Sequence, residues 1–480
     1  MSRRRLSICA GSLRRDLVNK GLLHRAGALL ALIGLLAFVT AMPASAAAEW
    51  PEGTAPGLTS DAAVIMDAKS GVVLYDLAMD EMRYPASITK VMTAYLGILN
   101  GNLADTVTID EEAASYAVAG SANQRTKVGE VFTLEELLYG TMLASANDMA
   151  TAIGVHIGGG SIETFAGMMN AKAAELGCTG TNFVNACGMP NDNHYTTAHD
   201  MALIFRAAIQ NETFRKIINT HSYTIPPTNL TDSERSFANH DPLLTNPEYA
   251  YPGIIGGKTG NTDAAGQTLV NAVNRNGMEY IVVTMHAPSA PDAASDHIKL
   301  FDYAYANFTV QEVGLAKYRT SGGFISLPVG AKADDCTVEK AEDAGKGTVT
   351  YTYTYKGRYA GEMVMTKENE KLYLAELKAE EEKAADESRK AAGISSPDGK
   401  DGPDSKAAAE SEISASSSTE SNSSPEPAEK KETPLMRKIL IVLGVLVAVG
   451  FGMVLVSIHL TRERRRRYKL RRKRKRGKRG

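Results

Sequence analysis

The sequence is poor in the residues that build metal centres. It has nine histidines and four cysteines among 480 residues, and it contains neither a His-Glu-x-x-His motif nor a His/Cys cluster at metal-ligand spacing. His194 and His199 are therefore interpreted as structural or site-bordering residues. The glycines of IGGGS at 157–161 lack the lysine-containing pattern of a phosphate-binding loop and indicate a helix end. We expect no metal ion and no other cofactor.

Cysteine is also too scarce for a scaffold that depends on disulfides, and 44% hydrophobic content is enough for two or three domains with their own cores. Cys9 falls in an N-terminal segment that we expect to be removed, so Cys178, Cys187 and Cys336 remain. An odd number leaves at least one free thiol unless two chains cross-link. A bridge between Cys178 and Cys187 is an open alternative.

Charge is distributed unevenly along the chain. The formal net charge of -2 conceals a charge of +13 over residues 461–480 and +6 over residues 1–25, which leaves -21 for the remainder. A body this acidic is not expected to bind nucleic acid.

Both ends carry apolar segments with basic flanks. Residues 1–48 combine an arginine-rich start, an apolar run and small residues at Ala44 and Ala46, which is typical of a secretory signal peptide. Residues 439–460 form a 22-residue apolar segment of about 33 Å, the thickness of a bilayer core, which predicts a transmembrane helix. The basic tail at 461–480 places the C-terminus in the cytoplasm. We therefore expect a single-pass protein of the cell membrane whose main part is extracytoplasmic.

The block at 58–310 mixes strand and helix patterns. The segments 62–77 and 267–287 are each expected to form a hairpin, turning at DAKSG and NRNG. Amphipathic helices are expected at 134–159, 162–177, 198–209 and 295–308. Hairpins at both ends of a helical middle predict an α+β fold, an antiparallel sheet covered by helices.

Composition changes after residue 310. Residues 311–375 alternate β-branched and aromatic residues, which predicts a small β domain, and 376–434 begin with a charged helix. From about 394 to 434 the chain is rich in serine, proline and glutamate, which is typical of a disordered linker.

Three short motifs occur in order within the first block. Ser87 and Lys90 stand three residues apart in YPASITKVMTAY, just inside an expected helix, Ser145 and Asn147 follow in ASANDMA, and IIGGKTGNT contains Lys258, Thr259 and Gly260. Each motif alone is weak, because a Ser-x-x-Lys pair suits an ordinary surface helix. The order Ser-x-x-Lys, Ser-x-Asn, Lys-Thr-Gly is that of penicillin-binding proteins and class A β-lactamases.

These segments, with GMPNDNHYTTAHDMALIFRA and the small β domain before a C-terminal anchor, resemble the D-alanyl-D-alanine carboxypeptidases, the low-molecular-mass penicillin-binding proteins. The resemblance is close over about 58–310 and general over 311–375, which is shorter than the usual second domain. Two departures stand out. Asn261 occupies a position that is often aromatic, and no arginine occurs between 276 and 318 to help bind a substrate carboxylate.

The resemblance implies a serine peptidase that removes the terminal D-alanine from peptidoglycan stem peptides and is acylated by β-lactam antibiotics. Ser87 would be the nucleophile, with Lys90 as base, since burial and the nearby Lys258 would lower the lysine pKa. Ser145 would relay a proton to the leaving amine, and Asn147 would bind the substrate backbone.

The same resemblance assigns the remaining residues of the site to substrate binding. Lys258 and Thr259, followed by Gly260, would bind the terminal carboxylate, and the N–H groups of Ser87 and Asn261 would form the oxyanion hole. Three alternatives remain open. They are a DD-endopeptidase on this scaffold, a β-lactamase on this scaffold and a non-catalytic wall-binding surface protein.

Overall fold

The computed structural model describes residues 48–51 and 56–391. The expected signal segment before residue 48, the linker at 394–434, the apolar segment at 439–460 and the basic tail lie outside the described residues.

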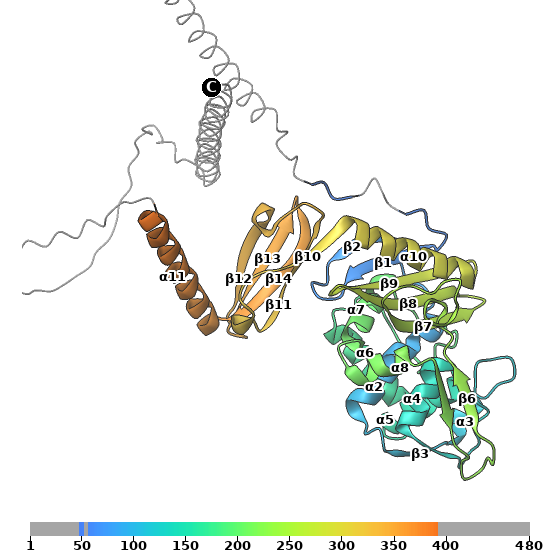
Figure 1. Cartoon of the computed structure of the whole chain (residues 1–480). Helices are drawn as coiled ribbons and strands as arrows, with labels where there is room; N and C mark the ends of the chain where they lie inside the picture. The colour runs from blue at the N-terminus through green and yellow to red at the C-terminus, as the bar shows by residue number, and fades with distance from the viewer. Residues whose placement is uncertain (1–47, 52–55, 392–480) are drawn as a thin grey trace, which may run out of the picture. The chain divides into compact units, whose positions relative to one another are not determined.

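The centre of the first block is a five-stranded antiparallel sheet with the order β2-β1-β9-β8-β7 (Figure 1). Both expected hairpins are confirmed. The second turns at Asn276 and Gly277, whose φ angles of 55° and 82° suit the tight turns that match strand twist. The strands are β1 (Ala62–Asp67), β2 (Val73–Leu77), β7 (Ile254–Thr262), β8 (Gly266–Arg275) and β9 (Met278–Ala287).

Both faces of this sheet are covered, which explains why its inner strands are almost continuously apolar. In β1, Val64 and Met66 join the core beneath most of the helices, whereas Ala63 and Ile65 join the core beneath α10. The expected α+β class is thereby confirmed. The α-helices of the block are α2 (Lys90–Asn100), α3 (Glu111–Ser115), α4 (Leu134–Leu143), α5 (Asn147–Ile157), α6 (Ile162–Glu175), α7 (Ala198–Ala208), α8 (Glu212–Asn219), α9 (Pro242–Thr245) and α10 (Ala290–Asn307).

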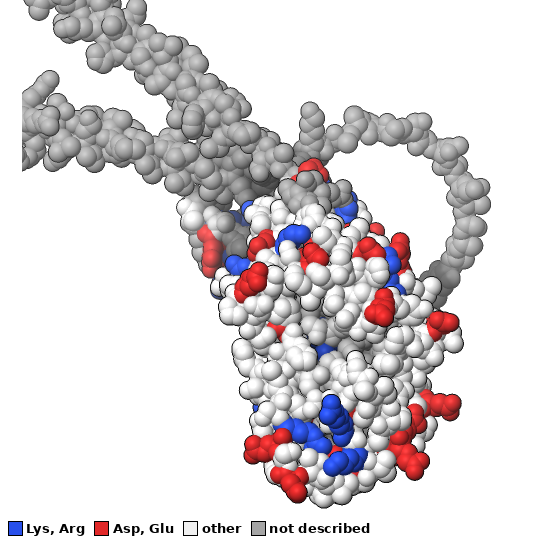
Figure 2. Space-filling model, turned by 90° about the vertical axis from the view of Figure 1, so that its right-hand side faces the viewer, with Lys and Arg blue, Asp and Glu red and all other residues white. Residues whose placement is uncertain are grey.

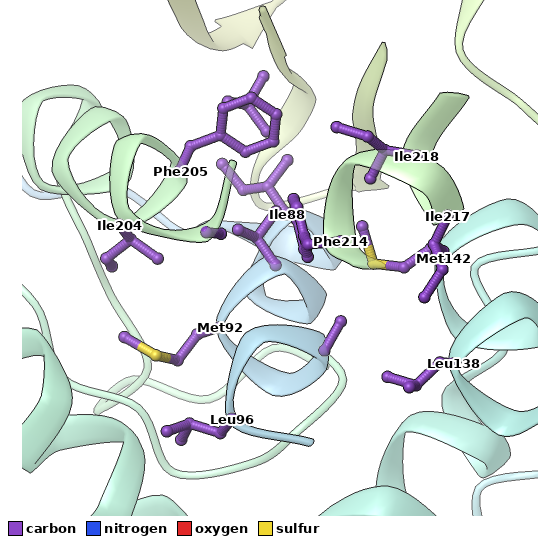
Figure 3. Close-up of a cluster of buried hydrophobic side chains, with 14 of the residues drawn as sticks. Ile88, Met92, Leu96, Leu138, Met142, Ile204, Phe205, Phe214, Ile217 and Ile218 are labelled. Carbon is purple, nitrogen blue, oxygen red and sulfur yellow. The ribbon is translucent and has the colours of Figure 1, made fainter. Parts of the chain in front are cut away.

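Helix α2 lies inside the helical layer. Figure 3 shows its apolar side chains Met92 and Leu96, with Ile88 of the turn just before it, facing side chains from α4, α7 and α8. Complete burial of a side chain of this size is worth about 1.5–3 kcal/mol. The start of α2 is therefore held from several sides, which matters because the first motif lies there.

The structure corrects one expected helix. The segment 134–159 is not continuous, because it breaks between α4 and α5, where Ser145 has a φ of 58°. A left-handed residue other than glycine cannot continue a helix and is held by its surroundings. Two small hairpins accompany the helices. They are β3 (Thr106–Thr108) with β4 (Val131–Thr133), and β5 (Ser222–Ile225) with β6 (Arg235–Ala238).

A second five-stranded antiparallel sheet follows α10, with the order β10-β11-β14-β13-β12. It has its own apolar core, which includes Ile325, Leu327 and Met365. The last helix, α11 (Lys367–Ala391), packs against β13 and β14, so the β region gives way to helix before residue 375. The strands are β10 (Phe308–Glu312), β11 (Ser321–Pro328), β12 (Thr337–Asp343), β13 (Thr348–Tyr355) and β14 (Arg358–Thr366).

Charged groups are mixed on the surface that Figure 2 shows. Near the lower end of this face several lysine and arginine side chains lie together, with aspartate and glutamate on either side of them. None of the helices within the described ranges is both long enough and apolar enough to cross a membrane.

Candidate active site

Ser87 lies on a tight turn at the entrance of α2. The turn is a 3-10 helix, η2 (Ala86–Thr89), and Lys90 begins α2 directly after it. Ala86 has a φ of 50°, a conformation that a residue with a side chain adopts only when its neighbours impose it. Ser87 and Lys90 lie one above the other on one face, as their spacing predicts.

The Lys90 ammonium group is fully buried and fully hydrogen-bonded. Its Nζ donates to Ser87 Oγ at 2.9 Å, to Asn147 Oδ1 at 2.7 Å and to the Cys187 carbonyl at 2.7 Å. Three acceptors match the three protons of an ammonium. The contact with Ser87 Oγ lies within the distance that proton transfer requires of a general base.

Burial lowers the pKa of Lys90 from 10.5 to about 8, although Cys187 and Asp148 act in the opposite direction. A lysine with this pKa is partly neutral near physiological pH. In that state Nζ has a lone pair and can accept the proton of Ser87.

Lys258 lies on β7, the edge strand of the central sheet, where it pairs with Val270 of β8. Its side chain is 1% exposed, and its Nζ donates to the Thr259 carbonyl at 2.8 Å. Burial and the charge of Lys90 hold the pKa of Lys258 well below its usual value, and Asp241 opposes this effect.

Burial is the largest cause of the lowered pKa of both lysines. We expected both burial and Lys258 to lower the pKa of Lys90, but burial is the cause found at Lys90. At Lys258, burial comes first and the charge of Lys90 adds to it in lowering the pKa. Any group that stabilises a charged Lys258 consequently bears on the site.

Gly260 allows β7 to approach Ser87 closely. A Cβ atom at this position would lie 2.9 Å from the Ser87 backbone nitrogen and 2.3 Å from Thr268 Oγ1. Thr268 in turn donates to the Pro85 carbonyl at 2.9 Å, which ties β8 to the turn that carries Ser87. A side chain at 260 would push the strand away from the nucleophile.

The break between α4 and α5 places the second motif beside the first. Ser145 is 7% exposed and Asn147 is 5% exposed. Asn147 accepts from Lys90 through Oδ1, and its backbone N–H donates to the Ala122 carbonyl at 2.8 Å. Its Nδ2 is 3.6 Å from Met189 Sδ. The side-chain oxygen thus serves the lysine, and the amide nitrogen remains the group suited to a substrate carbonyl.

A cleft of about 420 Å³ opens beside Ser87. Five of the eight residues predicted for the site line it, while Lys90, Asn147 and Lys258 are buried around it. The lining residues are Ser87, Gly120, Ala122, Ser145, His240, Pro242, Thr259, Gly260, Asn261, Gln267, Thr268, Leu269, Ala290 and Ala293.

Sequence reasoning missed the contribution of the segment before Met189. Cys187 supplies its carbonyl to Lys90, and Gly188, with a φ of 85°, passes so close to the Ala86 carbonyl that a Cβ would lie 1.8 Å from that oxygen. Both Cys178 and Cys187 are free thiols, so the alternative of a bridge between them is wrong. In the sequence this segment shows only a cysteine followed by a glycine, which does not indicate that the cysteine carbonyl binds a lysine.

Two histidines lie close to the site in different ways. His194 is buried, and its Nε2 lies 2.9 Å from Thr89 Oγ1. Burial and then the charge of Lys90 lower the pKa of His194 to about 4, so it is neutral and supports the turn. His240 lines the cleft, a position that its sequence context did not reveal.

The wall of the cleft on the α10 side is uncharged. Ala290 and Ala293 stand there, and none of the described residues that line the cleft is an arginine or lysine. Lys258, which is buried directly before the lining residue Thr259 on β7, is therefore a cation beside a lining that has none of its own.

The fold and the geometry define a serine acyl-transfer enzyme of the penicillin-binding and β-lactamase-like class. Residues 50–289 match the family described as Peptidase_S11, D-alanyl-D-alanine carboxypeptidase. The chain belongs to this family and is a serine-type D-alanyl-D-alanine carboxypeptidase.

Known proteins resemble the chain over most of their own length. A D-alanyl-D-alanine carboxypeptidase of Streptomyces sp. (strain K15) is 35% identical over 264 residues, which are 53% of this chain and 89% of that protein. D-alanyl-D-alanine carboxypeptidase DacF of Bacillus subtilis (strain 168) is 30% identical over 76% of this chain and 94% of its own length. The solved penicillin binding protein 5 from Haemophilus influenzae aligns with a TM-score of 0.55 at 27% identity, covering 65% of this chain and 98% of that one.

Proposed function

We propose that this enzyme cleaves the terminal D-alanine from peptidoglycan stem peptides on the extracytoplasmic side of the membrane, through an acyl-enzyme on Ser87. The observation that carries the proposal is the 2.9 Å contact between Ser87 Oγ and the buried Nζ of Lys90, at the edge of a cleft bounded by Thr259. A nucleophile, its base and a carboxylate-binding edge then lie around one cavity.

The proposed reaction proceeds in two halves. Ser87 Oγ attacks the carbonyl of the penultimate D-alanine while Lys90 takes the hydroxyl proton, and the backbone N–H groups of Ser87 and Asn261 stabilise the oxyanion. The C–N bond then breaks as Ser145 passes a proton to the departing amine. Water hydrolyses the ester in the second half, which returns a proton to Ser87 and frees the shortened peptide.

Recognition of the free end is assigned to β7. A protonated Lys258 and the Thr259 hydroxyl would bind the terminal carboxylate of the substrate, since a charged pair strengthens the hydrogen bonds. The Asn147 amide would hold the peptide backbone upstream of the cleaved bond. Such positioning contributes to rate by holding the carbonyl near the nucleophile.

The assay for this function uses the full chain in detergent and a peptide that ends in D-Ala-D-Ala. We expect release of free D-alanine at a rate that falls at least about 10³-fold in Ser87→Ala, because the covalent route is lost. Lys216→Ala, which changes a mostly exposed lysine, serves as control and keeps the wild-type rate. A wild-type chain that releases no D-alanine would contradict the proposal.

A DD-endopeptidase is the second candidate. The described wall of the cleft at Ala290 and Ala293 has no arginine that could bind a free terminal carboxylate. The same assay with a cross-linked peptide, in which the second D-alanine is followed by further residues, distinguishes the two. Faster cleavage of the cross-linked peptide than of the free D-Ala-D-Ala end would favour the endopeptidase.

We also propose that residues 439–460 anchor the chain in the membrane, with 461–480 in the cytoplasm and the catalytic block outside. The support is the 22-residue apolar segment and the position of the basic residues, which precede the N-terminal apolar run and follow the C-terminal one. Protease added to wall-stripped cells should cut within 394–434 and release the catalytic block. A cytoplasmic marker protein serves as control and should stay intact. Release only after the membrane is breached would show that the block lies inside.

A further inference from the structure

Asn185 is a buried amide, 7% exposed, that the proposed mechanism does not use. Its Oδ1 accepts from the backbone N–H of Cys187 at 3.2 Å and from that of Gly188 at 2.7 Å. Its Nδ2 donates to the Met189 carbonyl at 3.0 Å. Two N–H groups facing the oxygen and a carbonyl facing the nitrogen agree on which way the amide is turned. The side chain therefore holds the bend formed by residues 185–189 from within.

One peptide unit of the 185–189 bend connects Asn185 with the catalytic lysine. The unit between Cys187 and Gly188 donates its N–H to Asn185 Oδ1 at 2.7 Å. Its C=O accepts from Lys90 Nζ, also at 2.7 Å. The N–H and C=O of a trans peptide point in opposite directions within one plane, so a bond at one end restrains the other. Hydrogen bonds in such a chain also strengthen one another. The carbonyl that Lys90 meets is thus held by Asn185.

The direction of this carbonyl matters once Lys90 is neutral. A neutral amine has two N–H groups and one lone pair. Nζ has three partners, which are Ser87 Oγ at 2.9 Å, Asn147 Oδ1 at 2.7 Å and the Cys187 carbonyl at 2.7 Å. Amide and peptide oxygens accept and do not donate, so these two take the two N–H groups. The lone pair then faces Ser87 Oγ, whose proton it receives.

The bend also rests against the turn that carries Ser87. Gly188 has a φ of 85°, and a Cβ there would lie 1.8 Å from the Ala86 carbonyl oxygen and 2.9 Å from Thr89 Oγ1. Glycine permits both this backbone conformation and this close approach. The outer side of the bend is therefore placed by its contact with η2, and its inner side is held by Asn185.

We propose that Asn185 is a positioning residue that holds the Cys187 carbonyl so that neutral Lys90 directs its lone pair at Ser87 Oγ. The inference rests on the proposed role of Lys90 as general base. It gives the 185–189 bend a part in the reaction through one backbone carbonyl, without any side chain of the bend meeting the substrate.

The titratable groups around Lys90 are all retained when Asn185 is replaced. Burial lowers the pKa of Lys90, while Cys187 and Asp148 of α5 act against burial. Burial and then the charge of Lys90 lower the pKa of both Lys258 and His194. The amide itself has no titratable proton. A changed pH dependence in a variant at this position therefore reports the hydrogen bonds of Lys90 and no lost or added charge.

The test is Asn185→Ala, which removes the acceptor of two N–H groups. The matched control is Asn211→Ala, because Asn211 Oδ1 accepts in the same way from Thr213 N at 2.9 Å and Phe214 N at 3.1 Å at the start of α8. Both substitutions should lower the thermal unfolding temperature. Asn185→Ser keeps an oxygen that can accept from the same N–H groups, more weakly than asparagine. It should give intermediate values, and it carries the test should Asn185→Ala not fold.

Acylation of the full chain in detergent by labelled penicillin is measured at pH values well above 8, where Lys90 is neutral. The limiting rate should fall about tenfold in Asn185→Ala, the upper range for one hydrogen bond, and stay at the wild-type value in Asn211→Ala. The penicillin concentration that gives half of this rate should change little, because Asn185 does not line the cleft. A wild-type rate in Asn185→Ala would overturn the proposal. Equal losses in both alanine variants would also overturn it, since lowered stability would then be the cause.

An NMR titration of lysine Cε without substrate gives a readout independent of activity, with the Lys90 resonance assigned by its loss in Lys90→Ala. A carbonyl that accepts from an ammonium stabilises the charged form. The midpoint should therefore move to lower pH in Asn185→Ala and stay in place in Asn211→Ala. An unmoved or raised midpoint in Asn185→Ala would contradict the inference. A wild-type chain that penicillin does not acylate would refute the proposed function instead, and the midpoint would then decide whether Asn185 holds the carbonyl.

Discussion

Replacing Lys90 by alanine should abolish acylation of Ser87 while the fold is retained. The substitution removes the group that takes the Ser87 proton at 2.9 Å, and general-base catalysis typically contributes about 10²–10⁴-fold to a rate. The measurement is the rate at which labelled penicillin or a D-Ala-D-Ala peptide acylates the enzyme. Thermal unfolding followed in parallel tests that the fold is intact, and Lys216→Ala is again the matched lysine control.

Lys258→Ala should behave differently, which separates the roles of the two lysines. Its effect should fall mainly on KM for peptides with a free terminal carboxylate and only partly on the acylation step. An active Lys90→Ala enzyme would refute the assigned base. Equal loss of acylation in both variants would mean that the two lysines act as one catalytic unit.

The lowered pKa of Lys90 gives this prediction a pH dependence. Lys90 is a base only when neutral, and its pKa is about 8. The kcat/KM of the wild-type enzyme should therefore rise with pH through about 8 and level off above it. A rate that falls over this range would require the protonated lysine and would contradict the assignment.

The fold was predictable from the sequence where one pattern decided the structure locally. Alternating and continuous apolar runs with turn residues predicted both hairpins, and both are present. The expected helix at 134–159 was wrong because apolar periodicity continues through Ser145, whereas its φ of 58° is imposed by tertiary contacts. Periodicity cannot report a break that the rest of the fold enforces.

The site could likewise be predicted where a short motif decides the geometry, and not where contacts between distant segments decide it. The spacing of Ser87 and Lys90 was enough to place them on one face. That Asn147 accepts from Lys90 through its side-chain oxygen, and that Cys187 contributes only a carbonyl, depends on chain segments far apart in sequence.

The fate of the penicillin adduct is the second result with a large expected effect. In class A β-lactamases a glutamate, followed four residues later by asparagine, positions the water that frees the acyl-enzyme. Between Asn147 and Lys258 the chain has five glutamates, and none has an asparagine four residues later: Glu163, Glu175, Glu212, Glu234 and Glu248. The structure adds that none of the described residues lining the cleft is a glutamate or aspartate.

Penicillin should therefore acylate Ser87 and leave slowly, because attack needs only Lys90 and the oxyanion hole, whereas release needs an activated water. A D-alanyl peptide leaves no bulky ring remnant in the cleft, so its acyl-enzyme should still turn over with Lys90 or Ser145 assisting the water. We expect a long-lived adduct with labelled penicillin on a gel, absent in Ser87→Ala, together with measurable release of D-alanine by the wild-type enzyme. Lys216→Ala should form the adduct as the wild type does. Penicillin hydrolysis faster than peptide cleavage would instead identify a β-lactamase, and it would mean that a group outside the lining of this cleft supplies the water.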